Sequence, residues 1–229
     1  ASSAASGAGR GGGVILNVWE PGINKASSDF DIRHQLNANF LYELPFGKGK
    51  KYLGSTKGWM NQLVGGWQLS GLMRVRSGLP IGVSGSGIYN TNYYSGTPAY
   101  LIGEAPSTGR YVNEYGNPSL FSDRSGAMSV FRDGFMGQGG TRNLLRRPWN
   151  KNVDLSVMKS FGMPWEGHQV SFRAEAFNAF NFVNFTTLAL GINNSTTFGQ
   201  FSAAEDPRVF QLSLRFKTQE PTETMKGFI

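Results

Sequence analysis

The chain has 229 residues, of which 39% are hydrophobic and 16% are charged, and 31 are glycine. Soluble globular chains carry about 25% charged and about 45–50% apolar residues, so both classes are low, which suits two-faced strands joined by long polar loops. The lack of cysteine excludes disulfides and thiolate metal sites. The net charge of +7 is dispersed along the chain without a basic stripe, which argues against nucleic-acid binding.

The first 27 residues are predicted to form a flexible loop, with a weak first strand at 14–19. Residues 1–13 are small and polar and lack the apolar segment of a signal peptide. We therefore expect either that a signal has been removed or that the chain begins within a longer precursor. No run of 18 apolar residues occurs, so a transmembrane helix is not expected.

The clearest periodic segment spans 31–44, where side chains alternate between apolar and polar over 14 residues. Ordinary soluble strands have about 5–6 residues. A strand this long, with one apolar and one densely polar face, is typical of a membrane barrel that faces lipid outside and water inside. The apolar face holds Ile32, His34, Leu36, Ala38, Phe40, Tyr42 and Leu44.

The same alternation recurs in four later segments, which are 67–76, 152–161, 169–176 and 210–216. The sequence therefore predicts an all-β fold with five strands, or six if 14–19 is included. We interpret them as antiparallel up-and-down strands from the C-terminal end of a transmembrane β-barrel.

The connections alternate between short and long. Segments 45–58 and 162–167 are rich in glycine and proline and predict turns, whereas 79–149 and 181–207 are long polar loops. Outer-membrane barrels have short periplasmic turns and long extracellular loops, so we expect both long loops outside the cell. A soluble β-sandwich stays open as an alternative, although it should have shorter loops.

Six blocks of this sequence resemble, in order and spacing, the last strands of Oar-like TonB-dependent receptors, which carry a carboxypeptidase-regulatory-like N-terminal domain. The similarity covers about residues 28–216. The blocks are 28–35 (SDFDIRHQ), 42–49 (YELPFGKG), 66–71 (GWQLSG), 76–80 (RSGLP), 172–181 (FRAEAFNAFN) and 209–216 (VFQLSLRF).

The resemblance implies a large barrel with an internal plug, energised by the TonB complex, that takes up a bulky siderophore, glycan or peptide. The chain departs from the family pattern because it has no plug and no TonB box, and because an atypical tail, 217–229, follows Phe216. Five or six strands cannot close so large a barrel, and open edges are not tolerated in lipid. We expect the remainder of a receptor chain, or other copies of this chain, to pair with the edges.

No enzymatic role is predicted, because the chain has no G-x-S-x-G elbow, no phosphate-binding loop and no H-E-x-x-H pattern. No catalytic, cofactor-binding or metal-ligating residue is assigned. Asp29 and Asp31 flank Phe30 and could bind a cation at a loop mouth, but a solvated acidic pair at a strand start is the favoured interpretation.

Two sets of residues are candidates for contact with a permeating ligand. Four tyrosines of the first long loop could stack on sugar or siderophore rings, although any exposed loop can carry tyrosine. Arg173 and Glu175 fall on the same polar face and predict an ion pair in the lumen. The four tyrosines are Tyr89, Tyr93, Tyr94 and Tyr100.

The sequence thus supports a transporter wall in the outer membrane, with lipid, the rest of the receptor including its plug, and the TonB complex as partners. The alternative is an extracellular fibre or structural subunit whose open strand edges pair with copies of itself. The run 177–185, rich in phenylalanine and asparagine, could support such assembly, but an ordinary strand end that enters a loop is favoured.

Overall fold

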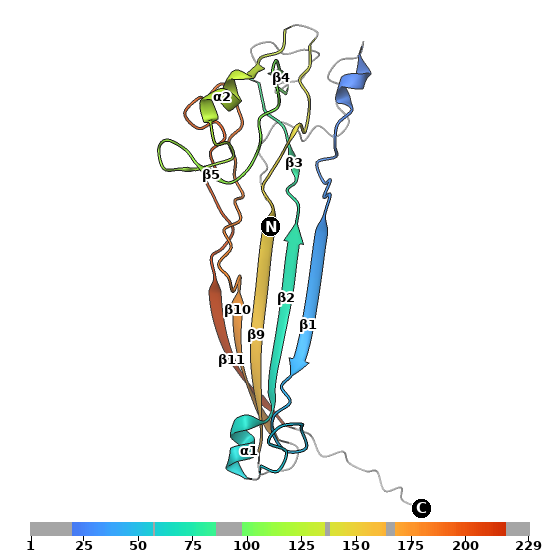
Figure 1. Cartoon of the computed structure of the whole chain (residues 1–229), viewed down its shortest axis with the longest axis vertical. Helices are drawn as coiled ribbons and strands as arrows, with labels where there is room; N and C mark the ends of the chain where they lie inside the picture. The colour runs from blue at the N-terminus through green and yellow to red at the C-terminus, as the bar shows by residue number, and fades with distance from the viewer. Residues whose placement is uncertain (1–19, 57, 86–97, 136–137, 164–167, 219–229) are drawn as a thin grey trace, which may run out of the picture. The chain divides into compact units, whose positions relative to one another are not determined.

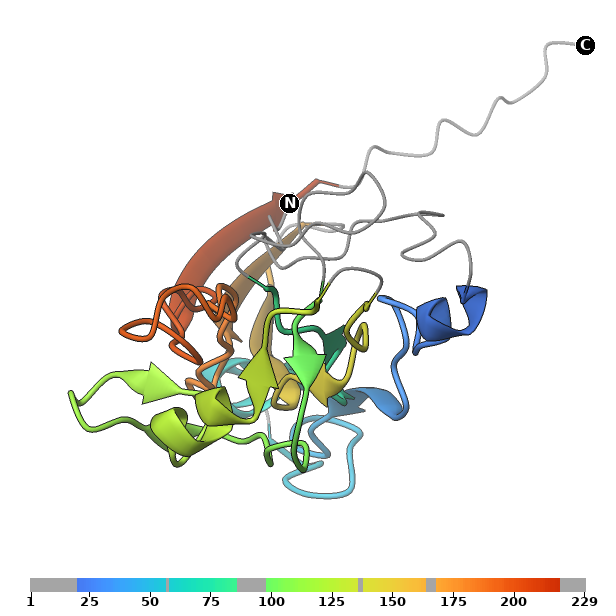
Figure 2. The ribbon, with the colours of Figure 1, turned by 90° about the horizontal axis from the view of Figure 1, so that it is seen from above.

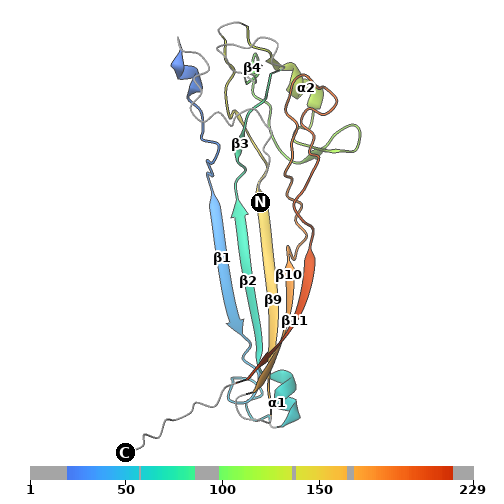
Figure 3. The same ribbon diagram turned by 180° about the vertical axis from the view of Figure 1, so that it is seen from behind.

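The computed structural model describes residues 20–56, 58–85, 98–135, 138–163 and 168–218. Five strands form one sheet in the order β1-β2-β9-β10-β11, and they lie side by side in this order from the front and from behind (Figure 1, Figure 3). Their bounds are β1 Gln35–Glu43, β2 Trp67–Arg76, β9 Asn150–Gly162, β10 Gln169–Phe177 and β11 Val209–Lys217. The five predicted strands are confirmed, and the weak strand at 14–19 lies outside the described residues.

Neighbouring strands of this sheet run antiparallel. β10 pairs in this way with both β9 and β11. The backbone N–H of Leu44 donates to the carbonyl of Trp67, and that of Ser77 donates to the carbonyl of His34, which fixes β1 and β2 as antiparallel too. Seen from above, β11 (red) bends round, so the sheet is curved (Figure 2).

The first strand is shorter than the sequence predicted, because it begins at Gln35 and not at Asp31. The carboxylate of Asp31 forms an ion pair with Arg146, and its carbonyl accepts a second bond from the same guanidinium at 3.1 Å. The backbone N–H of Asp31 donates to the carbonyl of Ser28 at 3.0 Å, so both backbone groups of Asp31 have partners outside the sheet. Residues 31–34 therefore continue the apolar and polar alternation of β1 in the sequence, but they are not part of the strand.

The chain divides into two compact units. The sheet unit comprises 37–74, 152–182 and 207–229, and the loop unit comprises 1–36, 75–151 and 183–206. The sheet unit also contains helix α1 (Trp59–Val64), which the sequence did not predict and which lies where β1 ends and β2 begins (Figure 1). No helix within the described ranges is long and apolar enough to span a membrane.

The predicted long loops contain short regular elements. Three two-stranded sheets pair β3 with β8, β4 with β7 and β5 with β6. The elements of the first long loop are β3 Pro80–Ile81, β4 Tyr100–Leu101, β5 Tyr111–Val112, β6 Pro118–Ser119, α2 Arg124–Ser129, β7 Phe131–Arg132 and β8 Leu145–Arg146. A short 3-10 helix, η1 Pro21–Asn24, lies in the N-terminal segment that the sequence predicted as a flexible loop. The N-terminus of α2 is capped by the carboxylate of Asp123, which accepts a bond from the backbone N–H of Gly126 at 2.9 Å.

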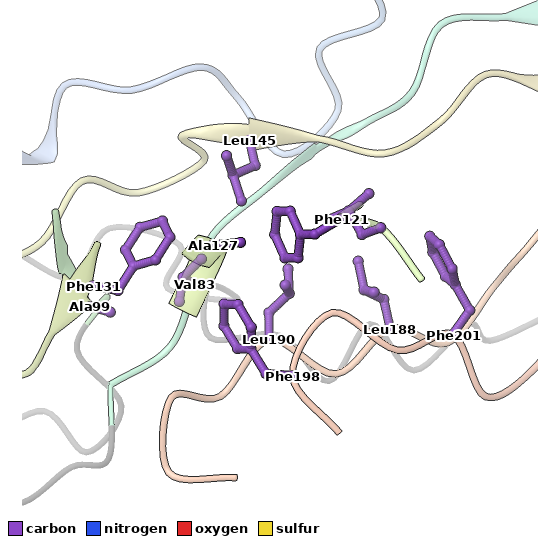
Figure 4. Packing of buried hydrophobic residues seen from close by; sticks show 11 residues of the cluster. Val83, Ala99, Phe121, Ala127, Phe131, Leu145, Leu188, Leu190, Phe198 and Phe201 are labelled. Atoms are coloured by element: carbon purple, nitrogen blue, oxygen red, sulfur yellow. The ribbon is translucent and has the colours of Figure 1, made fainter. Parts of the chain in front are cut away.

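Every hydrophobic side chain that is buried in the described part of the chain belongs to the loop unit. Rings from distant segments stack there, with Phe121 on Phe198 at 5.4 Å and Phe185 on Phe201 at 4.5 Å between centroids. Figure 4 shows the buried side chains of this core, Phe121, Phe198 and Phe201 among them, pointing toward one another from several segments. The core consists of Val83, Ala99, Leu120, Phe121, Ala127, Phe131, Leu145, Leu188, Leu190, Phe198 and Phe201.

Candidate functional site

The strand registers collect the apolar side chains of the sheet unit into rows. Ala176 of β10 lies opposite Leu155 of β9 on one side and Phe210 of β11 on the other. The neighbouring rows repeat this arrangement, with Ala174 between Val157 and Leu212, and Phe172 between Lys159 and Leu214. Because side chains alternate along a strand, all of these positions share one face.

The row through Ala176 extends to β2 and β1 at Gly71. A Cβ atom at Gly71 would overlap the ring of Phe40 and would lie 3.0 Å from a methyl group of Leu155. The ring of Phe40 thus occupies the space that a side chain at Gly71 would fill. Along this row, large residues on β1 and β9 flank the small residue on β2. This packing shows that β1 and β2 present their predicted apolar faces on the same side as β9.

The apolar face is exposed, above all on β11. Leu214 is 74% exposed, and Phe210 and Leu212 are each 69% exposed. Leaving such a side chain in water costs about 1.5–3 kcal/mol relative to burying it, and contiguous apolar surface of this kind marks a contact with lipid or protein. A soluble β-sandwich would bury this face in a core, and the described strands do not.

The opposite face of the sheet carries a connected polar network. Arg74 of β2 forms an ion pair with Asp154 of β9 at 3.5 Å, and the carboxylate of Asp154 also accepts bonds at 2.9 Å from the side chain of Asn152 and the backbone N–H of Asn178. The hydroxyls of Ser160 and Ser171 lie 3.2 Å apart across β9 and β10. This face is suited to contact with water or with a polar solute.

The predicted pair Arg173 and Glu175 is brought together on this face, with 3.6 Å between guanidinium nitrogen and carboxylate oxygen. Arg173 also approaches the sulfur of Met158 at 3.8 Å. That the pair lines a lumen stays a prediction.

Of the four predicted contact tyrosines, only Tyr100 lies within the described residues. It belongs to β4, and the guanidinium of Arg132 covers one face of its ring at 4.5 Å from the centroid. The covered face is unavailable for stacking on a ligand. Tyr89, Tyr93 and Tyr94 lie outside the described residues, so their role stays a prediction.

The sequence favoured a solvated pair for the acidic residues near the start of β1, and the structure differs from this interpretation. Asp31 is bound by Arg146, and Asp29 accepts a bond at 2.5 Å from the amide of Asn143, which also donates to the carbonyl of Ser27. These partners occupy the carboxylates that a cation would need. The sequence could not reveal them, because they lie more than 100 residues away along the chain.

Sequence reasoning also missed the structural role of the arginines in the loop unit. Arg147 donates to the carbonyl of Thr186, and Arg124 binds the carboxylate of Glu114 and the carbonyl of Thr196. Burial lowers the pKa of Arg147 through loss of solvation, although guanidinium groups remain charged in proteins. These arginines are dispersed along the sequence, but in the structure they connect separate segments of the loop unit by hydrogen bonds.

An antiparallel sheet with one polar face and one exposed apolar face defines the wall of a membrane protein that crosses the bilayer with strands. The family model described as "Outer membrane beta barrel domain" matches residues 1–211 of this chain. The chain belongs to this family, and its long strands are antiparallel strands of an outer-membrane β-barrel. Searches of curated proteins and of solved structures each return no significant match.

Proposed function

We propose that the chain forms part of the barrel wall of a TonB-dependent outer-membrane transporter for a bulky ligand such as a siderophore, glycan or peptide. The observation that carries this proposal is the two-faced sheet with both edges open to pairing. All nine residues of β1 and all nine of β11 are exposed. In a membrane, such edges must pair with further strands. The resemblance to Oar-like receptors implies that these strands belong to the rest of the receptor chain.

In this proposal the apolar face contacts outer-membrane lipid, and the polar network faces a lumen that contains the plug. The paired charges Arg74–Asp154 and Arg173–Glu175 offset one another there, and Arg215 of β11 stands on the same face, so a bulky solute meets a polar wall that also carries positive charge. The chain contributes no chemical step. The TonB complex acts through another part of the receptor.

Uptake measurements in cells that make the whole receptor test the proposal. Cells are supplied with labelled siderophores, glycans and peptides, with TonB present, with TonB deleted, or with the proton-motive force collapsed. We expect accumulation of at least one ligand to require the receptor, TonB and the proton-motive force together. Receptor-dependent accumulation that persists without TonB, or no receptor-dependent uptake of any of the three classes, would contradict it.

The same open edges favour a second candidate function, which is self-assembly into an extracellular fibre. Strand addition between β11 of one copy and β1 of the next would satisfy both edges without a barrel. Electron microscopy of the purified chain distinguishes the two. Regular polymers in detergent-free buffer support the fibre, whereas dispersed particles that require detergent support the transporter wall.

A further inference from the structure

Helix α1 carries its hydrophobic side chains on the side that faces away from the protein. Leu63 lies three residues after Met60 and four residues after Trp59, so the three side chains share one helix face. Their exposed fractions are 75%, 48% and 65%. A helix on the surface of a water-soluble protein shows the opposite arrangement, with its apolar stripe turned inward.

The polar face of α1 is used to attach the helix. The side-chain oxygen of Asn61 accepts a bond from the backbone N–H of Lys48 at 2.6 Å. The amide of Gln62 donates to the carbonyl of Gly162, at the end of β9, at 2.9 Å. These two bonds turn the opposite face of the helix outward, so the exposure of the hydrophobic residues is built into the fold.

The C-terminal end of α1 rests on the apolar face of the sheet. The indole N–H of Trp67 donates to the carbonyl of Leu63 at 3.0 Å. Lys159, which stands in the apolar row of β9, donates to the carbonyl of Gly65 and lies 4.9 Å from the ring centre of Phe161. The C-terminal end of α1 therefore adjoins the exposed apolar face of the sheet.

The segment 44–66, which joins β1 to β2 and contains α1, is basic as well as hydrophobic. It holds four lysines and no aspartate or glutamate. Among the lysines described in this segment, only Lys50 forms an ion pair, with Glu43 of β1 at 2.9 Å, and both of these side chains are exposed. Exposed tryptophan and leucine beside Lys48 and Lys51, which form no ion pair within the described residues, match the chemistry of a membrane interface, with hydrocarbon next to phosphate.

We propose that 44–66 is a membrane-surface anchor, in which the outward face of α1 inserts at the boundary of headgroups and acyl chains and the lysines bind phospholipid phosphates. Lipid is the occupant that both observations favour, because the surface is positively charged and continuous with the lipid-facing rows. The anchor would fix the height of β1 and β2 in the bilayer. It does not depend on which ligand, if any, the barrel transports.

Because the 229-residue chain has no cysteine, single cysteines introduced into it permit a direct test by spin labelling, with any cysteines in the rest of the receptor replaced by serine. The protein, in the receptor to which it belongs, is reconstituted into phosphatidylethanolamine vesicles that contain phosphatidylglycerol, with a nitroxide at Leu63→Cys or at the exposed turn position Ser55→Cys. We expect oxygen to relax the label at 63 several-fold more than a water-soluble nickel chelate does, with the reverse at 55. A label at 63 that nickel reaches freely, or that neither reagent reaches, would overturn lipid contact.

The lysine contribution is tested by Lys48→Gln together with Lys51→Gln, which leaves the pair of Lys50 and Glu43 intact. With the label at 63, the unsubstituted protein should show an oxygen-to-nickel ratio that rises at least twofold when phosphatidylglycerol is added. The double variant should lose most of that rise while keeping its circular-dichroism spectrum. An unchanged response to phosphatidylglycerol would overturn the assignment of the lysines to lipid phosphates.

Discussion

Lys159 is the one charged residue in the central apolar rows of β9, where its neighbours two positions away are Val157 and Phe161. Its ammonium group is satisfied by the carbonyl of Gly65 and by the faces of two aromatic rings, Trp67 and Phe161. A lysine within an apolar surface is tolerated when its charge reaches a polar partner in this way. Lys159 thus couples the sheet to the turn that holds α1.

Replacing Lys159 with methionine keeps most of the side-chain volume but leaves the Gly65 carbonyl without its donor. We expect the substitution to destabilise the protein by about 1–3 kcal/mol, the cost of losing a charged hydrogen bond. Urea unfolding of the reconstituted protein measures the change. Lys151→Met, at an exposed position of the same strand, is the control and should shift stability by less than about 0.5 kcal/mol. Equal effects of the two substitutions would contradict this role.

Within the loop unit, Arg146 holds the segment that leads into β1. It binds the carboxylate and the carbonyl of Asp31 and the carbonyl of Gly78. Arg146→Met should lower the free energy of unfolding by about 1–3 kcal/mol, which is less than for a fully buried pair because this pair is partly exposed. The substitution should also raise hydrogen exchange in 28–34. In a double-mutant cycle with Asp31→Asn, strictly additive effects would show that the pair contributes no coupling.

At the scale of elements, the packing of Phe40, Gly71 and Leu155 helps to set the alignment of β1 beside β2. Gly71→Val should displace the Phe40 ring and destabilise the sheet by about 1–3 kcal/mol, as overpacking does. The complementary double variant, Phe40→Ala with Gly71→Val, restores the volume and should recover part of that loss. Urea unfolding compares the two variants with the unsubstituted protein. No recovery in the double variant would mean that the two residues do not share the space.

The sequence was sufficient to locate the five long strands, because a period of two residues persists through each of them. It could not locate the start of β1 at Gln35, since Asp31 is bound by Arg146, which lies 115 positions away along the chain. It also missed α1, which has six residues and turns its hydrophobic side outward, against the pattern that identifies a surface helix.

At the scale of the whole molecule, the chain separates two kinds of hydrophobic packing. The loop unit buries its large side chains in a core, whereas the sheet unit presents them at its surface. The sequence predicted the second arrangement from alternation. It did not predict the first, because the core residues are scattered over 83–201 without a regular period.

Because the two units pack separately, a substitution in the core of the loop unit should destabilise that unit and leave the sheet unit stable. Phe198 is fully buried between the rings of Phe121 and Phe131, so Phe198→Ala should cost the loop unit about 3–5 kcal/mol. Hydrogen exchange should then rise in 98–131 and 183–206 while β10 and β11 stay protected, because local stability differs between cooperative units. Equal loss of protection in β10 would contradict independent units.

The sidedness of the long strands is tested most directly on β11, which offers unbroken alternation from Phe210 to Phe216. Single cysteines are placed in turn at each of these seven positions, labelled with a nitroxide and measured in vesicles with oxygen and with a nickel chelate. We predict oxygen-dominated relaxation at 210, 212, 214 and 216 and nickel-dominated relaxation at 211, 213 and 215. A profile without a period of two, or one in which the even positions are the water-exposed ones, would contradict the account.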